Sequence, residues 1–317
     1  MCMKYSIGID IGGMSIKAGL VDDNGCITEK KVVKTVRSAE EDVNNIVALV
    51  NSLLSAAELT ENDVNGIGIG CPGAVNGKTG MVDILPNLGW ENVPLGKKLK
   101  DHFSVPIKIS NDANVAALAE AIYGAAKGLE NVIMLTLGTG VGGGIIINEK
   151  IYEGKDCKGA ELGHATLVMD GYPCTCGRNG CIECYVSATA LIRQTKEAMI
   201  ENEFSGMWKY CNDEINNVNG KTAFDCAKQG DAAAIKVVSD YVKYLSESLM
   251  SMMNIFRPDI IILGGGVSGQ GAYLIDKIHA YCEKFHYGYK GGPKPVIKCA
   301  ELGNDAGIIG AAALLNQ

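Results

Sequence analysis

Alternating and unbroken apolar stretches open both halves of the chain. Residues 5–11 and 15–21 predict two strands joined by a tight glycine turn, and 26–33 predicts a third strand after a second turn. The pattern returns at 131–137 and 145–148, two predicted strands that flank a second glycine turn. Because both halves begin with a glycine-tipped hairpin, the sequence predicts a duplicated α/β architecture with a cleft between its two parts.

Helical spacing of apolar residues predicts four helices: 39–57, 113–123, 231–256 and 305–315. Short apolar runs predict three further strands: 64–70, 105–110 and 259–263. Since no linker rich in Pro or Ser divides the chain, we place the domain boundary after the second helix. The expected domains are 1–128 and 129–304, and we expect the last segment, 305–317, to pack back on the first domain.

Composition narrows the class of protein. The chain has 317 residues, of which 47% are apolar, enough to build the cores of two domains. The net charge is −7 and no block of Lys and Arg stands out, which argues against a nucleic-acid partner. The apolar runs are too short to span a bilayer, and the first residues lack the layout of a signal peptide. We therefore expect a cytoplasmic protein with no membrane partner.

The first glycine turn carries candidate phosphate chemistry. Gly12 and Gly13 allow the backbone to approach a phosphate closely and to expose its N–H groups. Asp10 ends the strand and could hold Mg²⁺ directly or through water, while Ser15 and Lys17 supply further donors. The alternative is a structural hairpin, because a Gly-Gly tip is common without any ligand.

Two more glycine segments point to a nucleotide. Residues 138–144 hold five glycines in seven positions, which strand stability does not explain, so Gly138, Thr139 and Gly140 are predicted to wrap a phosphate. The segment 264–266 (Gly264, Gly265 and Gly266) follows a buried strand and precedes a helix, where α/β sheets bind ligands. It lacks the acidic residue of a nicotinamide site, so contact with adenosine is favoured.

A polar group, Asn111, Asp112 and Asn114, lies between an apolar strand and an Ala-rich helix. Helix capping by Asn111 or Asp112 is the structural alternative, although a cap needs only one such residue. A carboxylate at a strand–helix junction can instead accept the proton of a substrate hydroxyl. Phosphoryl transfer otherwise needs mainly positioning and charge neutralisation. We predict that Asp112 is a general base.

Thiols cluster in one part of the chain. Of twelve cysteines, Cys174, Cys176, Cys181 and Cys184 lie close in sequence and follow His164. Clustered thiols in a cytosolic chain indicate metal ligands, and this pattern is typical of a structural Zn²⁺ site. Spacing leaves two ligand sets open, the first three cysteines with either His164 or Cys184. Reduced thiols without a metal are the alternative.

Carboxylates flank this cluster. Glu161 and Glu183 could accept hydrogen bonds from the hydroxyls of a sugar, or could be solvated surface residues. Asn87 and Gly73 are weaker candidates for the same role.

Together these segments resemble the ROK family (repressor, open reading frame, kinase), specifically its glucokinase branch. The resemblance covers essentially the whole chain and is most specific where Glu161-x-Gly-His164 precedes the cysteine cluster. It implies an α/β fold of the actin-like ATPase (ribonuclease H-like) class, with two domains around a central cleft that close on sugar and ATP. One departure is Pro173, which stands where the family pattern usually has Gly.

The resemblance also implies roles for the candidate residues. Asp112 is then the general base, and five residues contact sugar hydroxyls: Asn111, Asp112, Glu161, His164 and Glu183. His164, Cys174, Cys176 and Cys181 bind the structural Zn²⁺, which leaves Cys184 out. ATP with Mg²⁺ is the expected phosphate donor, with polyphosphate as an alternative, and a homodimer is expected.

The expected reaction converts glucose and ATP to glucose 6-phosphate and ADP. N-acetylmannosamine, fructose, mannose and allose are the alternative sugars within the family. A sugar-sensing transcriptional regulator is a second hypothesis, disfavoured because Asp10 stands too early for a preceding DNA-binding segment. A third is an actin-like ATPase that binds no sugar and whose cysteines hold an iron–sulfur cluster.

Overall fold

The predicted strand and helix pattern is visible in a computed structural model that describes residues 5–285, 287, 294 and 296–317. The chain divides into two compact units. The first comprises Met1–Met134, Gly144–Ala160 and Glu301–Gln317, and the second comprises Leu135–Gly143 and Glu161–Ala300. The division runs through two strands, and the domain bounds expected from the sequence stay a prediction.

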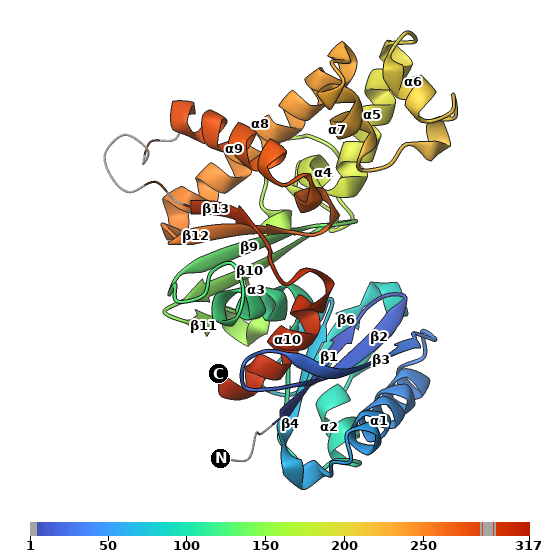
Figure 1. The fold of residues 1–317 in the computed structure, drawn as a ribbon, viewed down its shortest axis with the longest axis vertical. Helices are drawn as coiled ribbons and strands as arrows, with labels where there is room; N and C mark the ends of the chain where they lie inside the picture. Colours follow the sequence, from blue (N-terminus) through green and yellow to red (C-terminus); the bar gives the residue numbers. More distant parts are fainter. Residues whose placement is uncertain (1–4, 286, 288–293, 295) are drawn as a thin grey trace. The chain divides into compact units, whose positions relative to one another are not determined.

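The main sheet of the first unit has the order β3-β2-β1-β4-β8 (Figure 1). Its strands are β1 (Tyr5–Ile11), β2 (Ser15–Val21), β3 (Ile27–Lys34), β4 (Val64–Cys71) and β8 (Ile107–Asn111). β1, β2 and β3 pair antiparallel, whereas β4 runs parallel to both β1 and β8. The carboxyl ends of β1, β4 and β8 therefore meet at one edge, where Asp10 pairs with Gly70 and Cys71 pairs with Asn111.

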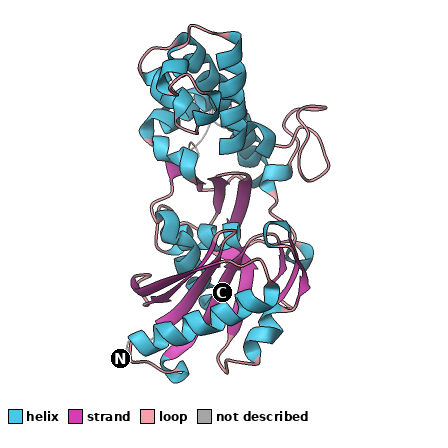
Figure 2. Ribbon diagram, turned by 90° about the vertical axis from the view of Figure 1, so that its right-hand side faces the viewer, coloured by secondary structure: helices cyan, strands magenta, loops and turns pink. Residues whose placement is uncertain are grey.

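Helices pack on this sheet (Figures 1 and 2). They are α1 (Ala39–Ala56), α3 (Asp112–Ile122) and α10 (Ala306–Ala313). The apolar side of α1 shares a core with Ile7 and Ile9 of β1. Side chains alternate along a strand, so Gly8 and Gly68 point the other way, toward the backbone of α10. Glycine at these two positions lets α10 approach the strands closely.

Adding one methyl group at this contact should destabilise the first unit. In Gly68→Ala the new Cβ would lie 1.7 Å from the backbone oxygen of Ala311, so strand and helix must separate. Overpacking of this kind costs about 1–3 kcal/mol or more, and we expect a melting temperature several degrees lower by calorimetry. In the control Gly220→Ala no atom lies within 4 Å of the new Cβ. Equal shifts in both variants would rule out the close approach as the cause.

A small three-stranded sheet, of order β5-β6-β7, follows β4 in the chain. Its strands are β5 (Ala74–Asn76), β6 (Met81–Leu85) and β7 (Trp90–Val93), and α2 (Leu95–Lys100) follows them. Trp90 and Val82 are buried in the same core as β1 and β4. The sequence pattern predicts no strands here, because runs of three to five residues are too short for a period of two to stand out.

The second five-stranded sheet has the order β11-β10-β9-β12-β13. Its strands are β9 (Val132–Leu137), β10 (Val141–Ile147), β11 (Lys150–Ile151), β12 (Ile260–Gly264) and β13 (Val296–Cys299). In chain order this is the same arrangement as in the first sheet, third-second-first-fourth-fifth. The predicted duplication is therefore confirmed.

The predicted glycine turn at 138–144 is too long. β10 already begins at Val141, so Gly142, Gly143 and Gly144 are strand residues. Close backbone packing explains the glycine at the last of these positions, since a Cβ at Gly144 would lie 2.7 Å from the backbone oxygen of Ala113. Of the five glycines predicted to lie in a loop, only Gly138 and Gly140 lie outside the strand.

The helices of the second unit gather into a bundle (Figure 2). They are α4 (Glu183–Val186), α5 (Ala188–Glu201), α6 (Gly206–Tyr210), α7 (Thr222–Lys228), α8 (Ala232–Phe256) and α9 (Ala272–Phe285). The prediction for α8 is confirmed, with Asp231 as its N-cap accepting from the backbone N–H of Ala234. No helix in the described part of the chain has the length and apolar character needed to cross a membrane.

Candidate functional site

Candidate residues of the first unit meet at the carboxyl edge of its main sheet. Asp10 stands near the end of β1, Cys71 ends β4, and Asp112 follows β8. Burial raises the pKa of the Cys71 thiol, and the negative charges of Asp112 and Asp10 raise it further. Both carboxylates therefore lie near one buried sulfur, and the parallel register of three strands brings them together.

Asn111 is the N-cap of α3. Its Oδ1 accepts from the N–H of Ala113 at 2.9 Å, and its Nδ2 donates to the carbonyl oxygen of Gly73 at 3.2 Å. Asp112 is the first residue of the helix, and its Oδ1 also accepts from the N–H of Ala113, at 2.9 Å. The capping role that the sequence left open between the two residues belongs to Asn111. Asp112 is thus not required as the cap.

The glycine hairpin lies beside another candidate. The N–H of Gly12 donates to the carbonyl oxygen of Ser15 at 2.9 Å, which closes the turn. A Cβ at Gly13 would lie 3.9 Å from the Cβ of Asn87, so the structure brings these two predicted residues together. Asn87 is exposed, in a short 3₁₀ turn (Pro86–Leu88).

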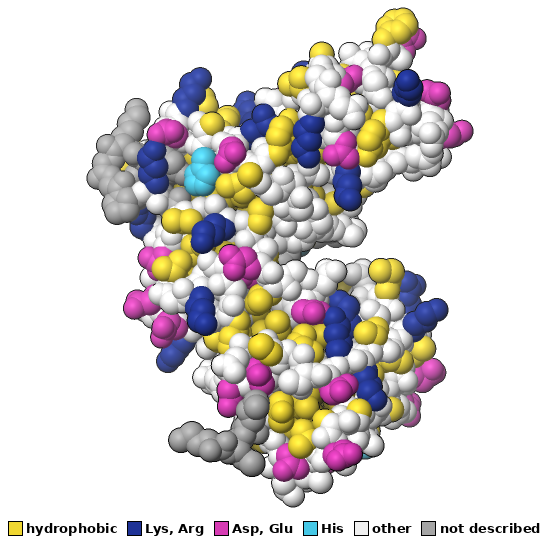
Figure 3. Space-filling view, viewed as in Figure 1, with side chains coloured by type: hydrophobic (Ala, Val, Ile, Leu, Met, Phe, Trp, Pro, Cys, Tyr) yellow, Lys and Arg dark blue, Asp and Glu magenta, His cyan; other side chains and the backbone are white. Residues whose placement is uncertain are grey.

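Lys17 and Asp10 are charged groups at this hairpin, and they pair with each other. The Lys17 ammonium lies 3.2 Å from Oδ2 of Asp10, and both side chains are partly buried. On the face drawn in Figure 3, Lys and Arg side chains are interspersed with Asp and Glu. A phosphate bound at the hairpin would therefore depend on nearby N–H groups and Lys17 rather than on a broad positive surface.

The other two glycine segments lie together in the second unit. Gly265 has a φ of +80°, and a Cβ there would lie 2.5 Å from the carbonyl oxygen of Leu137, the residue before Gly138. The hydroxyl of Ser268 donates to the carbonyl oxygen of Gly265 at 2.7 Å and fixes this turn. Gly138 in turn accepts from the N–H of Ala188 at 2.8 Å, at the start of α5. Two loops far apart in sequence thus form one glycine-lined surface.

The predicted metal ligands also come together. His164, Cys174, Cys176 and Cys181 each offer one ligand atom, and these atoms all lie within 4.8 Å of one another. Nδ1 of His164 lies 3.5 Å from the Cys174 sulfur, and the sulfurs of Cys176 and Cys181 are 3.6 Å apart. Cys184 is not part of the group, and its thiol donates to the carbonyl oxygen of Pro173 at 3.5 Å.

The donor set fits a thiophilic cation. The N–H of Arg178 holds the pKa of the Cys176 thiol below its ordinary value, whereas burial raises the pKa of Cys181 to about 12. The ligand atoms of three thiols and one imidazole lie within 4.8 Å of one another, and thiolates that close repel each other unless a cation lies among them. The set supplies four ligands, three sulfurs and one imidazole nitrogen, and structural Zn²⁺ sites bind four such ligands in tetrahedral geometry.

Glu183 connects the cluster to the glycine loop. Its Oε2 accepts from the N–H of Val141 at 2.8 Å, and a Cβ at Gly140 would lie 2.2 Å from the same oxygen. Its Oε1 lies 3.9 Å from the Cys174 sulfur. Glu161 is exposed, and its carbonyl oxygen accepts from the N–H of His164 at 3.1 Å. One oxygen of Glu183 is therefore already used within the protein, which the sequence did not predict.

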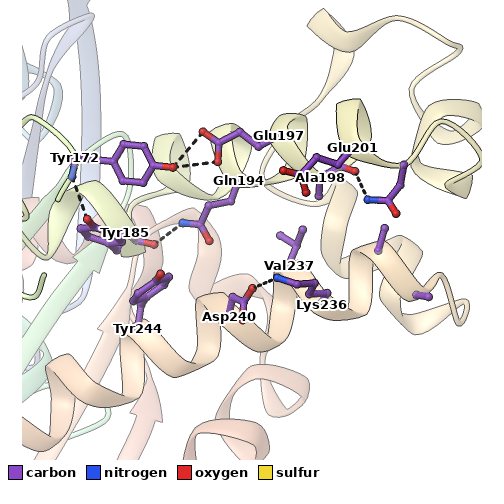
Figure 4. Close-up of a pocket in the computed structure, with 13 residues that line it drawn as sticks. Tyr172, Tyr185, Gln194, Glu197, Ala198, Glu201, Lys236, Val237, Asp240 and Tyr244 are labelled. Carbon is purple, nitrogen blue, oxygen red and sulfur yellow. Dashed lines mark hydrogen bonds and ion pairs between the residues drawn. The ribbon is translucent and has the colours of Figure 1, made fainter.

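Side chains of α5 support the segment that carries the cysteines, and Figure 4 shows Glu197 beside Tyr172 and Gln194 beside Tyr185. The N–H of Tyr172 donates to the hydroxyl of Tyr185 at 3.0 Å, and Gln194 donates to the carbonyl oxygen of Tyr185 at 2.8 Å. Arg193 donates to the carbonyl oxygen of Cys184 at 2.7 Å and stacks over the ring of Tyr172. These supports were missed because nothing in their spacing marks them.

Tyr172, Tyr185 and Gln194 also line a cavity of about 380 Å³ between α5 and α8. Of its charged lining residues, Lys236 pairs with Asp240, and Glu197 pairs with Arg193, which lies outside the lining. With Glu201 the lining holds three carboxylates and one ammonium group, so its own charge is net negative.

Known proteins resemble this chain over its full length. The profile of the ROK family matches residues 6–317. A glucokinase from Halalkalibacterium halodurans is 34% identical, over 100% of this chain and 96% of that protein. The crystal structure of a ROK family glucokinase from Streptomyces griseus in complex with glucose and AMPPNP is 36% identical, with a TM-score of 0.82 over 98% of both chains. A xylose repressor from Bacillus spizizenii is 28% identical, over 98% of this chain and 77% of its own length.

Proposed function

Because the chain belongs to the ROK family, we propose that it is an ATP-dependent hexose kinase with glucose as its preferred sugar. The observation that carries this proposal is the full-length similarity to glucokinases, at higher identity than to the repressor. The site geometry supports it, because the residues expected to act on a sugar hydroxyl and on phosphates gather in two groups, one in each unit.

The proposed chemistry assigns proton transfer to Asp112. The carboxylate takes the proton of the sugar hydroxyl while that oxygen forms a bond to the γ-phosphorus of ATP. The bond from the γ-phosphorus to its bridging oxygen breaks, and the electron pair leaves with ADP. Asn111 holds the start of α3 through its cap and so fixes the position of Asp112.

The nucleotide is proposed to bind the glycine segments. The residues assigned to it are Asp10, Gly12, Gly13, Ser15, Lys17, Gly138, Thr139, Gly140, Gly264, Gly265 and Gly266. Backbone N–H groups of these turns suit phosphate oxygens because no side chain blocks their approach. Mg²⁺ bound with the nucleotide would neutralise phosphate charge, and Asp10 is the carboxylate placed to hold it.

The sugar is proposed to be held by the cysteine lobe and its neighbours. His164 turns Nδ1 toward the Cys174 sulfur, so a bound Zn²⁺ would fix the ring and leave Nε2 for a sugar hydroxyl. Glu161 and Oε1 of Glu183, which also accepts from the Cys174 thiol, would accept from other hydroxyls. Gly73 and Asn87 are the remaining proposed contacts.

A coupled assay of ADP release over a panel of hexoses with Mg-ATP tests the proposal. We expect kcat/KM for glucose to exceed that for N-acetylmannosamine, fructose, mannose and allose by about tenfold or more. Replacing ATP by polyphosphate tests the donor when the sugar phosphate is measured instead, because that transfer releases no ADP. A higher value for another hexose would contradict the glucose assignment. Failure to turn over any sugar, together with specific DNA binding in a gel-shift assay at physiological salt, would favour the regulator instead.

The homodimer and the cytoplasmic location stay predictions. Light scattering coupled to size-exclusion chromatography measures the first, because it gives the mass in solution independently of shape.

A further inference from the structure

A second anion site is indicated by a cavity of about 260 Å³ in the first unit. The turn between β5 and β6 forms one wall, α2 forms another, and Ile107 and Ile109 of β8 form an apolar part of the lining. None of the residues assigned above to sugar, nucleotide or metal lines it. It is therefore distinct from the proposed kinase site.

The two walls are locked together by close backbone contact. A Cβ at Gly80 would lie 3.0 Å from the Cα of Gly96, and the N–H of Gly96 donates to the carbonyl oxygen of Gly80 at 2.9 Å. Oδ1 of Asn76 accepts from the N–H groups of Lys78 and Thr79, both at 3.2 Å, which fixes the turn itself. The cavity is thus a built feature between two held elements.

The charge of the lining is entirely positive. Lys78 comes from the turn, and Lys97 and Lys100 come from α2 at a spacing of three, which puts them on one side of the helix. Among the described residues, no carboxylate lies within salt-bridge distance of these three ammonium groups, although the chain has a net charge of −7. Three like charges around one cavity repel each other, and a bound anion would offset that repulsion.

Nearby acids do not supply that anion. Glu153 approaches the turn from outside the lining, with its Oε2 3.8 Å from where a Cβ of Gly77 would be. Its other carboxylate oxygen accepts from the hydroxyl of Ser110. The three lysine side chains are exposed, so an anion from solvent can reach them.

We propose that this cavity binds a phosphoryl group, either free phosphate or the phosphate of a small phosphomonoester. Lysine ammonium groups bind phosphate as point charges, and the Thr79 hydroxyl is a further donor in the lining. The volume exceeds what one phosphate needs, and the isoleucine side chains offer apolar surface to the organic part of an ester. The proposal concerns binding alone and does not rest on the kinase activity.

Titration followed by ³¹P NMR tests this with the full-length protein, using orthophosphate in one arm and glucose 6-phosphate in the other. The test variant is K78Q/K97Q/K100Q, and the control K209Q/K221Q/K243Q removes three exposed lysines of the second unit. We expect the apparent Kd to rise about tenfold or more in the test variant and to stay unchanged in the control. Binding that persists equally in both variants belongs to another site.

Both arms bear on the proposal. Because glucose 6-phosphate is also the product expected at the kinase site, only the binding that the test variant loses is compared between the arms. Equal affinities in that part would assign the cavity to the phosphoryl group alone, and tighter binding of glucose 6-phosphate there would add the isoleucine surface. Restored affinity in K78R/K97R/K100R would support charge as the cause. Absence of binding to the wild type in both arms, or the same Kd in test variant and wild type, would overturn the proposal.

Discussion

Replacing Asp112 by Asn should lower kcat for the preferred hexose by about 10²–10⁴-fold, the range expected when a general base is lost. The amide keeps the shape of the side chain but cannot take the hydroxyl proton in the transition state. Because Asn111 provides the cap of α3, the substitution should leave the helix intact. Steady-state kinetics gives kcat, and calorimetric titration of the sugar should give a Kd within a few-fold of the wild type.

Two controls separate catalysis from structure. Asp101→Asn removes an exposed carboxylate of the same unit and should leave kcat within about twofold, as surface changes usually do. Asn111→Ala removes the cap and should lower the free energy of unfolding by about 1 kcal/mol. If Asp112→Asn instead lowered stability as much as Asn111→Ala while kcat stayed near normal, the carboxylate would be structural and the assignment wrong.

Much of the fold could be predicted because strong local patterns match it. The hairpin around Gly12 and the long α8 both appear where alternation and helical spacing put them, within one or two residues. The family membership inferred from the motifs is confirmed by the match over residues 6–317. The α/β actin-like ATPase class is confirmed by the ROK relatives of known structure.

Long-range contacts could not be predicted in the same way. Glu120 is fully buried in α3, and its carboxylate accepts from the N–H groups of Ala125, Glu301 and Leu302. A buried acid on an Ala-rich helix gives no sign of partners 181 and 182 residues away. The loop prediction was wrong at Gly144 for a related reason, since its backbone neighbour Ala113 lies in another element. Composition shows that a residue is unusual, but only the fold shows what it touches.

Part of the candidate site could likewise be predicted from the sequence, and part of it needed the fold. Spacing was enough to select cysteines whose sulfurs lie close together in the fold, whereas the role of Asp112 stays a prediction. Spacing could not decide whether His164 or Cys184 is the fourth ligand, since His164 precedes the same three thiols and Cys184 follows them, each at short distance. The structure places His164 in the group of converging ligand atoms and turns the Cys184 thiol to a carbonyl oxygen.

Serine substitutions can test whether His164 or Cys184 is the fourth ligand, and we expect a large effect on bound zinc and on KM for the sugar. Cys181→Ser should lower bound zinc from about one ion per chain to near zero, because a hydroxyl replaces one of four ligands. Cys184→Ser should keep the metal. Through the loss of a fixed His164, KM for the sugar should rise about ten- to hundredfold in the first variant and stay near the wild-type value in the second. Metal analysis of the purified proteins and steady-state kinetics measure the two effects.

The Cys181→Ser and Cys184→Ser variants test separately which residues bind the metal and whether the metal acts on sugar recognition. Both variants exchange one sulfur for one oxygen three residues apart, Cys181 just before α4 and Cys184 within it, so a general softening of this segment would affect both. Zinc lost only in Cys181→Ser, with no visible iron chromophore in any protein, fits the ligand set His164, Cys174, Cys176 and Cys181. Zinc lost also in Cys184→Ser would point to the all-cysteine set. If Cys181→Ser lost zinc but kept its KM, the metal would stabilise the loop without acting on sugar recognition, and His164 would have to reach the sugar without it.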